Sequence, residues 1–256
     1  MVLAILQART SSSRLYGKVL QPVLGRSMIL RELERLERSK EITKLILATS
    51  VDESDDELAL TVETEGYVVY RGSLDDVLAR YYTCAKEYEP EHVVRLTGDC
   101  PVIDWRLVDE VIRRHIAEEN DYTRTTDRFP DGLDTEVMTF AALEQAYRKA
   151  SLASEREHVT LYIRKHPELF RLGEVDAQED WSAMRWTVDE PRDLALIKHV
   201  FSLLYPTQPD FCMYDILALL KEHAELLSCN AGILRNEGLI KSLHTDKVYR
   251  KNGCAR

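Results

Sequence analysis

Short apolar runs that alternate with amphipathic helical patterns constrain the fold of this chain more than any other feature of its sequence. Four runs have the length of buried strands, at residues 2–6, 44–48, 67–70 and 92–96. Helical patterns follow them at residues 27–38, from Ser54 to Gly66, from Val77 to Ala85 and after Asp104. Two of these helices open with capping residues, Ser54-Asp-Asp-Glu57 and Asp104. This order predicts an α/β fold with a mostly parallel, doubly wound sheet.

Beyond residue 120 the alternation is less regular. We expect a strand or hairpin over 121–138, helices at 139–150 and 154–166, and strands near 169–175 and 184–188. A helix over 191–205 begins with Pro191 in the first turn, where proline is favoured. Residues 213–256 have the pattern of one helix followed by a basic tail. Because no Gly-, Ser- or Pro-rich linker divides its 256 residues, the chain predicts one domain with a smaller inserted or appended unit.

The five cysteines and the N-terminus predict a protein of the reducing cytoplasm. The cysteines are odd in number and never spaced as Cys-x-x-Cys, which disfavours a disulfide scaffold and a zinc site. No segment approaches the roughly 18 uninterrupted apolar residues of a membrane span. Arg9 follows the apolar run 1–6 with no basic region before it, so a signal peptide is not expected.

The formal net charge of −10 is unevenly distributed along the chain. Residues 1–31 carry five basic residues and no acidic one, and residues 241–256 carry five basic residues and Asp246 alone. The 209 residues between them hold the other 24 basic and 43 acidic residues. An acidic body repels the nucleic-acid backbone, so a role in binding DNA or RNA is disfavoured. A basic N-terminal loop on such a body favours a small polyanion as the ligand.

The loop after the first strand is the candidate site for that polyanion. Ligands of open α/β sheets bind at the carboxyl ends of the strands, and the first crossover is a usual phosphate site. This loop, residues 7–18, contains neither a Walker A sequence nor Gly-x-Gly-x-x-Gly. It offers the hydroxyls of Ser11 to Ser13, and the cations that could surround a triphosphate are Arg9, Arg14 and Lys18. The alternative is a solvated loop whose charges bind nothing.

Two aspartates that follow predicted strands are candidate metal ligands. Asp99 lies in a turn between Gly98 and Pro101, and Asp189 follows the run 184–188. Because Mg²⁺ needs few protein ligands, two carboxylates at strand ends could hold it against the phosphates of a substrate. The alternative is that each aspartate only caps the helix that follows it.

Four motifs occur in one order along residues 1–205. They are Gln7-Ala-Arg9 with Ser12-x-Arg14-Leu-x-Gly-Lys-Val-Leu20, Arg71-Gly-Ser-x-Asp-Asp-Val-Leu78, Arg95-Leu-Thr-Gly-Asp-Cys-Pro-Val-Ile-Asp104 and Trp186-Thr-Val-Asp-Glu-Pro-Arg-Asp-Leu194. Together they resemble the cytidylyltransferase family that includes the acylneuraminate and 3-deoxy-manno-octulosonate cytidylyltransferases. The spore-coat polysaccharide biosynthesis branch is the most similar, and Asn230 and residues 236–241 also resemble it.

The resemblance implies the architecture and the reaction. It implies a nucleotide-diphospho-sugar transferase (GT-A-like) fold over residues 1–205, with an acceptor and dimerisation insertion at about 121–183. Residues 206–256 are then a helical extension with a basic tail. The implied enzyme is a homodimer that uses CTP and Mg²⁺ to activate an acidic sugar or similar acceptor as a CMP conjugate, for surface polysaccharide or glycan biosynthesis.

The resemblance also implies roles for individual residues. The loop residues assigned to the nucleotide are Arg9, Ser11, Ser12, Arg14 and Lys18, and those assigned to its cytosine and ribose are Thr49, Arg71 and Ser73. Arg14 and Lys18 neutralise the charge that develops during transfer, and Asp99 and Asp189 hold the metal, with Asp99 also counted as catalytic.

The acceptor site is expected on the segments 131–137 and 154–160, where the family places its acceptor and dimer contacts. The candidate residues are Asp134, Glu136, Arg156 and His158. Arg156 and His158 could bind an acidic substrate, and the carboxylates could accept hydrogen bonds from its hydroxyls. The alternative is that Arg156 pairs with a neighbouring glutamate on an exposed helix and that His158 is a satisfied interior histidine.

Two other functions stay open at this point. One is a glycosyltransferase that uses a nucleotide sugar on the same fold, although Gly98-Asp-Cys-Pro101 is not the Asp-x-Asp metal signature usual for that class. The other is a non-catalytic nucleotide-binding subunit, against which the presence of Arg14, Lys18 and both aspartates weighs.

Overall fold

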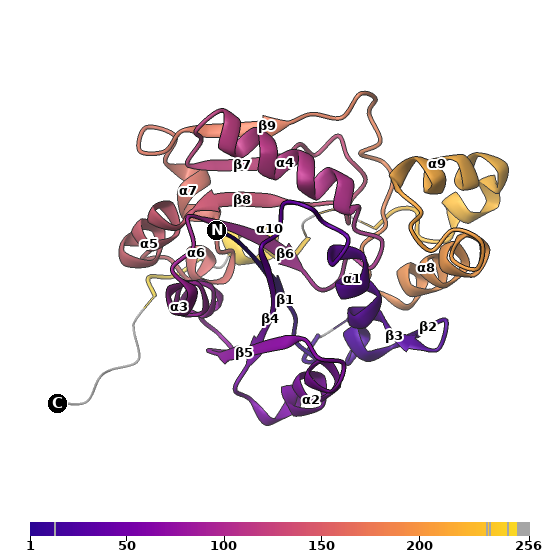
Figure 1. Ribbon diagram of the computed structural model, residues 1–256, viewed down its shortest axis with the longest axis horizontal. Coiled ribbons are helices and arrows are strands. Elements are labelled where there is room, and N and C mark those ends of the chain that lie inside the picture. The colour runs from indigo at the N-terminus through magenta and orange to yellow at the C-terminus, as the bar shows by residue number, and fades with distance from the viewer. Residues whose placement is uncertain (13, 234, 236, 245, 250–256) are drawn as a thin grey trace.

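A seven-stranded sheet forms the centre of the structure (Figure 1). The structure is a computed structural model that describes residues 1–12, 14–233, 235, 237–244 and 246–249. The strands lie in the order β5 (Val68–Gly72), β4 (Lys44–Ser50), β1 (Val2–Gln7), β6 (His92–Thr97), β8 (Glu136–Thr139), β7 (Tyr122–Thr125) and β9 (Leu172–Val175). In these pairings β8 is antiparallel to both neighbours and the other pairs are parallel. The predicted α/β class with a mostly parallel, doubly wound sheet is confirmed.

Helices cover both faces of the sheet. They are α1 (Met28–Leu36), α2 (Asp56–Thr64), α3 (Val77–Tyr88), α4 (Trp105–Ala117), α5 (Phe140–Lys149), α6 (Ala153–Glu157), α7 (Leu161–Lys165), α8 (Pro191–Leu204), α9 (Met213–Glu222) and α10 (Glu237–His244). Short 3₁₀ turns are η1 (Lys18–Leu20), η2 (Glu53–Asp55) and η3 (Ala224–Ser228). A small hairpin joins β2 (Pro22–Val23) to β3 (Arg26–Ser27).

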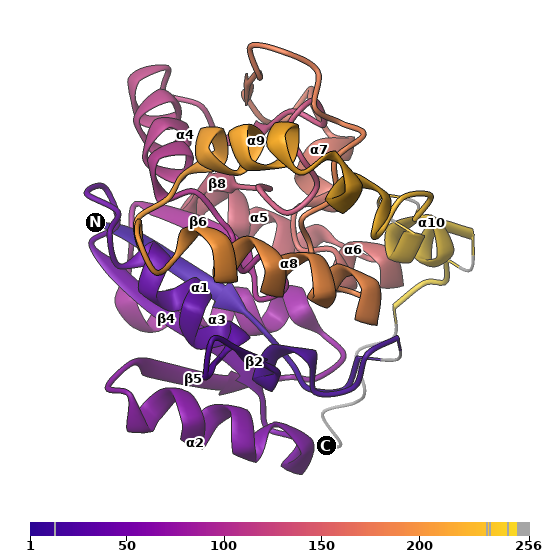
Figure 2. The ribbon, with the colours of Figure 1, turned by 90° about the vertical axis from the view of Figure 1, so that its right-hand side faces the viewer.

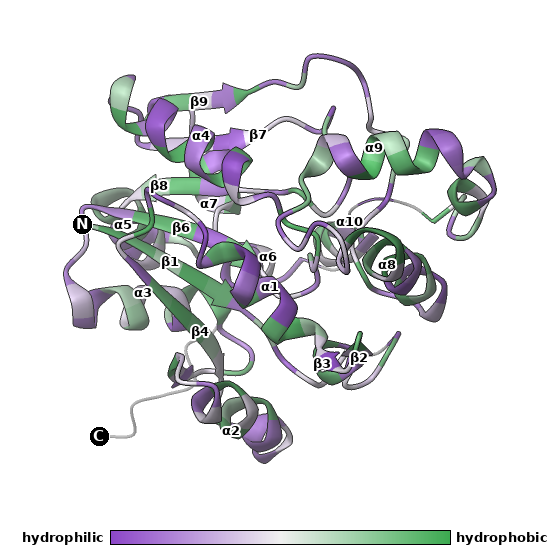
Figure 3. Ribbon diagram, turned by 45° about the vertical axis from the view of Figure 1, so that its right-hand side comes forward, coloured by the Kyte–Doolittle hydropathy of each residue, from purple (hydrophilic) through white to green (hydrophobic). Residues whose placement is uncertain are grey.

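The continuous apolar runs follow from this double coverage. Successive side chains of a strand face opposite sides. In β1, Ala4 and Leu6 belong to the core beneath α1, α4 and α8, whereas Leu3 and Ile5 belong to the core beneath α3 and α5. Figure 3 shows β1 and β4 as largely hydrophobic ribbons in the middle of the molecule. Since neither face of β1 meets water, its residues are apolar from Val2 to Leu6.

Several local predictions are confirmed. Asp104 caps α4 by accepting a hydrogen bond from the backbone N–H of Arg106 at 3.0 Å. Pro191 occupies the first turn of α8. The segment 121–138 forms the hairpin of β7 and β8, because their residues pair antiparallel from Tyr122–Met138 to Arg124–Glu136.

Other predictions are wrong, beginning with the helices. The expected capping box at Ser54 does not form, since Asp52 instead accepts from the N–H of Ser54 and opens η2. The single helix expected over 154–166 is broken into α6 and α7, because the backbone of His158 leaves the helical conformation (ψ 69°). The C-terminal region contains α9, η3 and α10 rather than one helix. Residues 250–256 of the predicted basic tail lie outside the described residues.

The strand expected at 184–188 is also absent. Its backbone N–H groups donate hydrogen bonds to two loops. Those of Trp186 and Thr187 donate to the carbonyl oxygen of Asp131, and the N–H of Val188 donates to the carbonyl oxygen of Asp99. Only an isolated bridge joins Asp131 to Arg185. The segment therefore joins the loops of Asp131 and Asp99 through backbone hydrogen bonds and adds no strand to the sheet. No helix of the described ranges has both the length and the apolar character needed to cross a membrane.

A buried histidine pair connects α4 to the sheet. The ring of His115 is fully buried, with Nδ1 3.1 Å from the hydroxyl of Thr123 and Nε2 3.1 Å from Nδ1 of His92. Burial, and secondly the neighbouring His92, lower the pKa of His115 to about 4. The folded protein therefore keeps this ring neutral at pH values where an unfolded chain protonates it.

We expect the stability of the protein to fall as the pH falls from about 6.5, the ordinary pKa of histidine, towards 4. In this window the unfolded state binds a proton that the folded state excludes, so acid favours unfolding. Urea unfolding at pH 7.5 and pH 5 measures the change. His115→Gln should weaken the pH dependence, whereas the matched change of the exposed His199 to Gln should not. An equal dependence in wild type and His115→Gln would contradict the assignment.

Candidate functional site

A buried carboxylate holds the loop that follows β1. Asp55 of η2 accepts hydrogen bonds from the backbone N–H and the hydroxyl of Thr10, at 2.8 and 2.9 Å. Burial alone would raise the pKa of Asp55, but hydrogen bonds from Ser50 and Thr10 outweigh it and lower that pKa. The carbonyl oxygen of Thr10 accepts from the N–H groups of Ser12 and Gly17, at 2.8 and 2.9 Å. These bonds fold the loop back on itself just before Lys18.

The ammonium group of Lys18 lies between two carboxylates. Its Nζ is 3.1 Å from Oδ2 of Asp99, 2.9 Å from Oδ1 of Asp189 and 2.7 Å from the carbonyl oxygen of Val188. The side chain is 9% exposed, so these ions are poorly screened by water. Burial alone would lower the pKa of Lys18, but the two carboxylates outweigh it and raise that pKa. Lys18 is therefore a fixed positive charge at the strand ends.

Asp99 reaches this position because β6 approaches β1 closely at its end. The N–H of Gly98 donates to the carbonyl oxygen of Gln7 at 2.7 Å. A Cβ at position 98 would lie 2.8 Å from side-chain atoms of Ala8 and Ile29. Glycine is therefore required here by close approach and not by a positive φ. Burial alone would raise the pKa of Asp99, but Lys18 and hydrogen bonds from neighbouring side chains lower it.

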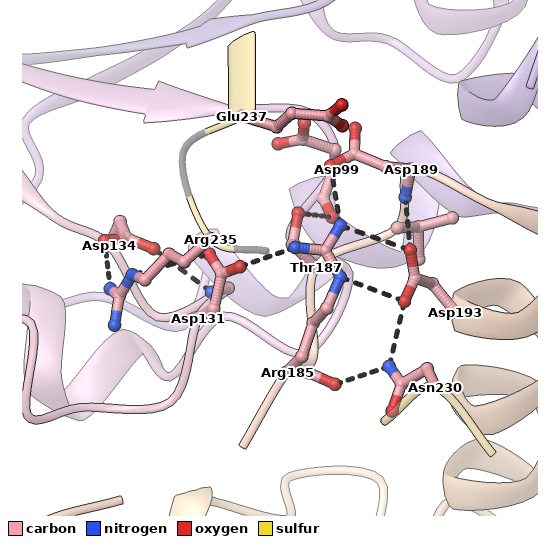
Figure 4. A network of polar contacts seen from close by, with 12 residues as sticks. Asp99, Asp131, Asp134, Arg185, Thr187, Asp189, Asp193, Asn230, Arg235 and Glu237 are labelled. Atoms are coloured by element: carbon pink, nitrogen blue, oxygen red, sulfur yellow. Dashed lines mark hydrogen bonds and ion pairs between the residues drawn. The ribbon is translucent and has the colours of Figure 1, made fainter. Parts of the chain in front are cut away.

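Arg185 positions Asp189 through a network that Figure 4 shows. Its guanidinium group contacts Oδ2 of Asp131 and Oδ2 of Asp189, both at 2.7 Å, and Oδ1 of Asp193 at 3.1 Å. Asp193 accepts from the N–H groups of Asp189 and Glu190 at the start of α8. The alternative that Asp189 caps this helix is therefore wrong. Asp99 does not cap α4 either, since Asp104 does so.

Two adjoining cavities open at this edge of the sheet. The loop cavity, of about 390 Å³, is lined on one side by Arg9, Ser12, Arg14 and Lys18 and on the other by residues of α6 and α10. The arginine cavity, of about 250 Å³, is named for its lining residues Arg95, Arg124, Arg164 and Arg185. Arg14, Asp99, His158, Asp189 and Glu237 line both. A ligand with two parts could therefore occupy both cavities at once.

The two aspartates fit the predicted divalent cation. They come from different segments, converge on one cationic group and face both cavities. Carboxylate oxygens are the donors that Mg²⁺ prefers, and two of them are enough when a substrate supplies others. Among the described residues no group of three or more histidine, cysteine or acidic residues could hold a metal alone. The site thus suits a metal shared with a ligand and does not suit a closed structural metal centre.

The structure brings only part of the predicted nucleotide site together. Arg9, Ser12, Arg14 and Lys18 share the loop cavity, whereas Ser11 does not line it and Ser13 lies outside the described residues. The three residues assigned to cytosine and ribose, Thr49, Arg71 and Ser73, line neither cavity. Thr49 is fully buried, Arg71 binds Asp56 at 2.6 Å, and Ser73 accepts from the N–H of Asp76.

Three of the four predicted acceptor residues line the arginine cavity. Asp134 binds Arg235 at 2.7 Å. Glu136 is held by Arg95, Tyr122 and Thr160, and although burial alone would raise the pKa of Glu136, Arg95 and these hydroxyls lower it to about 2. His158 contacts the hydroxyl of Ser242 at 3.1 Å, and burial lowers its pKa. His158 is thus neither a surface residue nor a fully interior one.

Arg156 does not reach either cavity. Its guanidinium group is 2% exposed and lies 2.5 to 3.0 Å from the carboxylate of Asp76, the N-cap of α3. It also donates to the carbonyl oxygen of Tyr147. The alternative of an exposed pair with a neighbouring glutamate is wrong, because the partner, Asp76, is remote in sequence and the pair is buried.

Sequence reasoning missed several residues of the cavities. Arg185 had one signal, its spacing of four and eight residues from Asp189 and Asp193, which a charge-pattern search could have found. Arg95 opens a motif but carried no assigned role. Arg124 on β7 and Arg164 on α7 had no such signal, since strand pairing and the packing of α7 bring them to the site. Glu237 lies in the segment 236–241, which resembles the family but carried no assigned role.

The chain is similar to known proteins over most of its length. A family model described as cytidylyltransferase matches residues 3–228. The uncharacterised protein MJ1063 of Methanocaldococcus jannaschii is 36% identical over 197 residues, or 76% of this chain and 81% of that protein. The spore coat polysaccharide biosynthesis protein SpsF of Bacillus subtilis is 34% identical over 231 residues, or 88% and 95%. The 3-deoxy-manno-octulosonate cytidylyltransferase of Geotalea uraniireducens is 24% identical over 96% and 91% of the two chains.

A solved structure supports the same grouping. The cytidylyltransferase of Leptospira borgpetersenii matches with a TM-score of 0.86 and 29% identity, over 91% of this chain and 99% of that one. The resemblance predicted from the four motifs is confirmed, and so is the nucleotide-diphospho-sugar transferase fold.

We expect Arg156→Leu to lower the free energy of unfolding by about 3–5 kcal/mol, because Asp76 would remain as an unpaired buried charge. Urea unfolding measures this loss. The matched control Arg148→Leu removes an exposed arginine of α5 and should change stability by no more than about 0.5 kcal/mol. Unchanged stability of Arg156→Leu together with lost acceptor binding would restore Arg156 to the acceptor site.

Proposed function

Because the chain belongs to the cytidylyltransferase family, we propose that it transfers the cytidylyl group of CTP to a small acidic acceptor and releases pyrophosphate. The observation that carries this proposal is the loop cavity, where Lys18 lies between Asp99 and Asp189 beside Arg9 and Arg14. The product is a CMP conjugate for surface polysaccharide or glycan synthesis. The relatives named for spore-coat polysaccharide synthesis and for 3-deoxy-manno-octulosonate support this assignment.

The chain's own residues bind and orient the triphosphate. Arg9, Ser12, Arg14 and Lys18 offer three cations and a hydroxyl on one side of the loop cavity. An oxygen of the acceptor attacks the α-phosphate in line, the bond to the pyrophosphate oxygen breaks, and the attacking hydroxyl loses its proton. Lys18 and Arg14 stabilise the negative charge that gathers on the phosphates. This chemistry depends on positioning and electrostatics, which a buried, fixed lysine supplies.

Asp99 and Asp189 are the residues that would hold Mg²⁺. When bound, Mg²⁺ supplies charge neutralisation at the phosphate oxygens. Arg185 and Asp193 hold Asp189 in position. Arg185 contacts its carboxylate, and Asp193 accepts a hydrogen bond from its backbone N–H.

The acceptor is assigned to the arginine cavity. Five arginines and His158 line it together with the carboxylates of Asp134 and Glu136, so it can bind both an acidic group and hydroxyls. Arg164 is the arginine best suited to the acid, because within the described ranges it forms no ion pair shorter than 4 Å. We propose a homodimer in the cytoplasm, on the basis of the family resemblance and of the cysteine pattern.

The proposal is tested by pyrophosphate release from CTP in the presence of a panel of acidic sugars. UTP and ATP are the nucleotide controls. CTP-dependent release with one acceptor supports the proposal. Consumption of a nucleotide sugar without use of CTP would instead make the protein a glycosyltransferase, and CTP binding without turnover across the panel would make it a binding subunit.

We expect Lys18→Ala and Asp99→Ala each to lower kcat at least about 10²-fold, in line with the loss of one contact made to a transition-state charge. Steady-state pyrophosphate release with the true acceptor measures the effect. Lys198→Ala, on the exposed face of α8, removes a charge away from the cavities and should keep wild-type turnover. Near-normal release by Asp99→Ala would exclude it as a metal ligand.

A further inference from the structure

The C-terminal strap, defined as the described residues from Asn230 to Tyr249, crosses the site. Asn230 is buried and donates to the carbonyl oxygen of Arg185 and to Oδ1 of Asp193, both at 2.9 Å. At the other end, Asp246 accepts from the N–H and the hydroxyl of Ser154 on α6. The strap is therefore fastened to opposite sides of the cavities. Figure 2 shows α10 along this path, beside α6.

Between these anchors, α10 forms a wall of both cavities. Glu237 and Gly238 line both, and Lys241 lines the loop cavity opposite the loop of Arg9 and Lys18. None of the residues of α10 is buried. The helix is thus held by its ends and by polar contacts rather than by an apolar face. Such a helix can shift or exchange partners at low cost.

Glu237 currently pairs with two cations of the loop cavity. Its Oε2 is 3.2 Å from Nη1 of Arg14, and its Oε1 is 2.7 Å from Nζ of Lys241. Arg14 is also 2.9 Å from Asp189. The carboxylate of Glu237 therefore neutralises Arg14 and Lys241, two cations that could otherwise bind an anionic ligand.

These pairs differ from that of Lys18 in their exposure. The side chains of Arg14 and Glu237 are 33% and 36% exposed, and that of Lys241 is 70% exposed. Exposed ion pairs contribute little to stability, so an anion of higher charge can replace the carboxylate. The contact of Lys18 with Asp189 is more buried, since these side chains are 9% and 16% exposed.

We propose that α10 is part of the nucleotide site: Lys241 binds the phosphates of the nucleotide, and Glu237 holds Arg14 and Lys241 in place until the phosphates replace it. This proposal rests on the proposed function, because it assigns further residues to the same phosphate site. It assigns a role to a part of the C-terminal segment that the reaction itself does not explain. It also predicts opposite effects for two neighbouring side chains.

The test is calorimetric binding of CTP and of inorganic tripolyphosphate to the full chain. Lys241→Met should weaken binding of both ligands by about tenfold, the usual loss for one contact to a charged group. Glu237→Gln should strengthen binding several-fold, because Arg14 and Lys241 then do not have to release the Glu237 carboxylate before they bind the phosphates. The matched controls Lys221→Met and Glu222→Gln make the same charge changes on the exposed end of α9 and should leave both affinities unchanged.

The outcomes separate this proposal from the function on which it rests. A merely structural helix would make both α10 variants bind more weakly, and that result overturns the proposal. Unchanged binding by Lys241→Met overturns it too, while CTP turnover by the wild type would still support the proposed function. If the wild type binds tripolyphosphate but not CTP, the proposed function fails, and the opposite shifts of the two variants with tripolyphosphate still support the role of α10.

Discussion

The buried contact of one ammonium group with two carboxylates organises the site of this protein. Lys18, Asp99 and Asp189 belong to segments that are remote in sequence. A charge taken out of water must be compensated by its neighbours. The loop after β1, the end of β6 and the segment before α8 therefore have to meet at one point.

Ion pairs of different burial have different uses around that point. Arg185 binds three carboxylates while only 7% exposed, and Arg156 binds Asp76 at a similar burial, so both fix backbone segments relative to each other. Arg14 and Glu237 meet at the mouth of the cavities, where water screens them. The cavities are therefore lined by exposed ion pairs and supported by buried ones.

The predictions were most accurate where local pattern and tertiary role agree. Three of the four apolar runs in the first 120 residues became the largely buried strands β1, β4 and β6, because helices cover both faces of the sheet, whereas β5 at the sheet edge is only partly buried. The segment 184–188 has the same apolar pattern, yet its N–H groups bind the carbonyl oxygens of Asp131 and Asp99. Sequence pattern reports which side chains are buried, but it does not report where the backbone hydrogen bonds go.

The sequence by itself determined the fold class, the family and the cationic character of the first loop, since hydrophobic period and residue type are local properties. Only the tertiary structure decided that Arg185 fixes Asp189, that Arg156 is buried against Asp76, and that α10 returns to line the site. These facts depend on which remote segments meet. The energy of a buried charge depends on the partner it meets, and that partner is set by the packing of the whole chain.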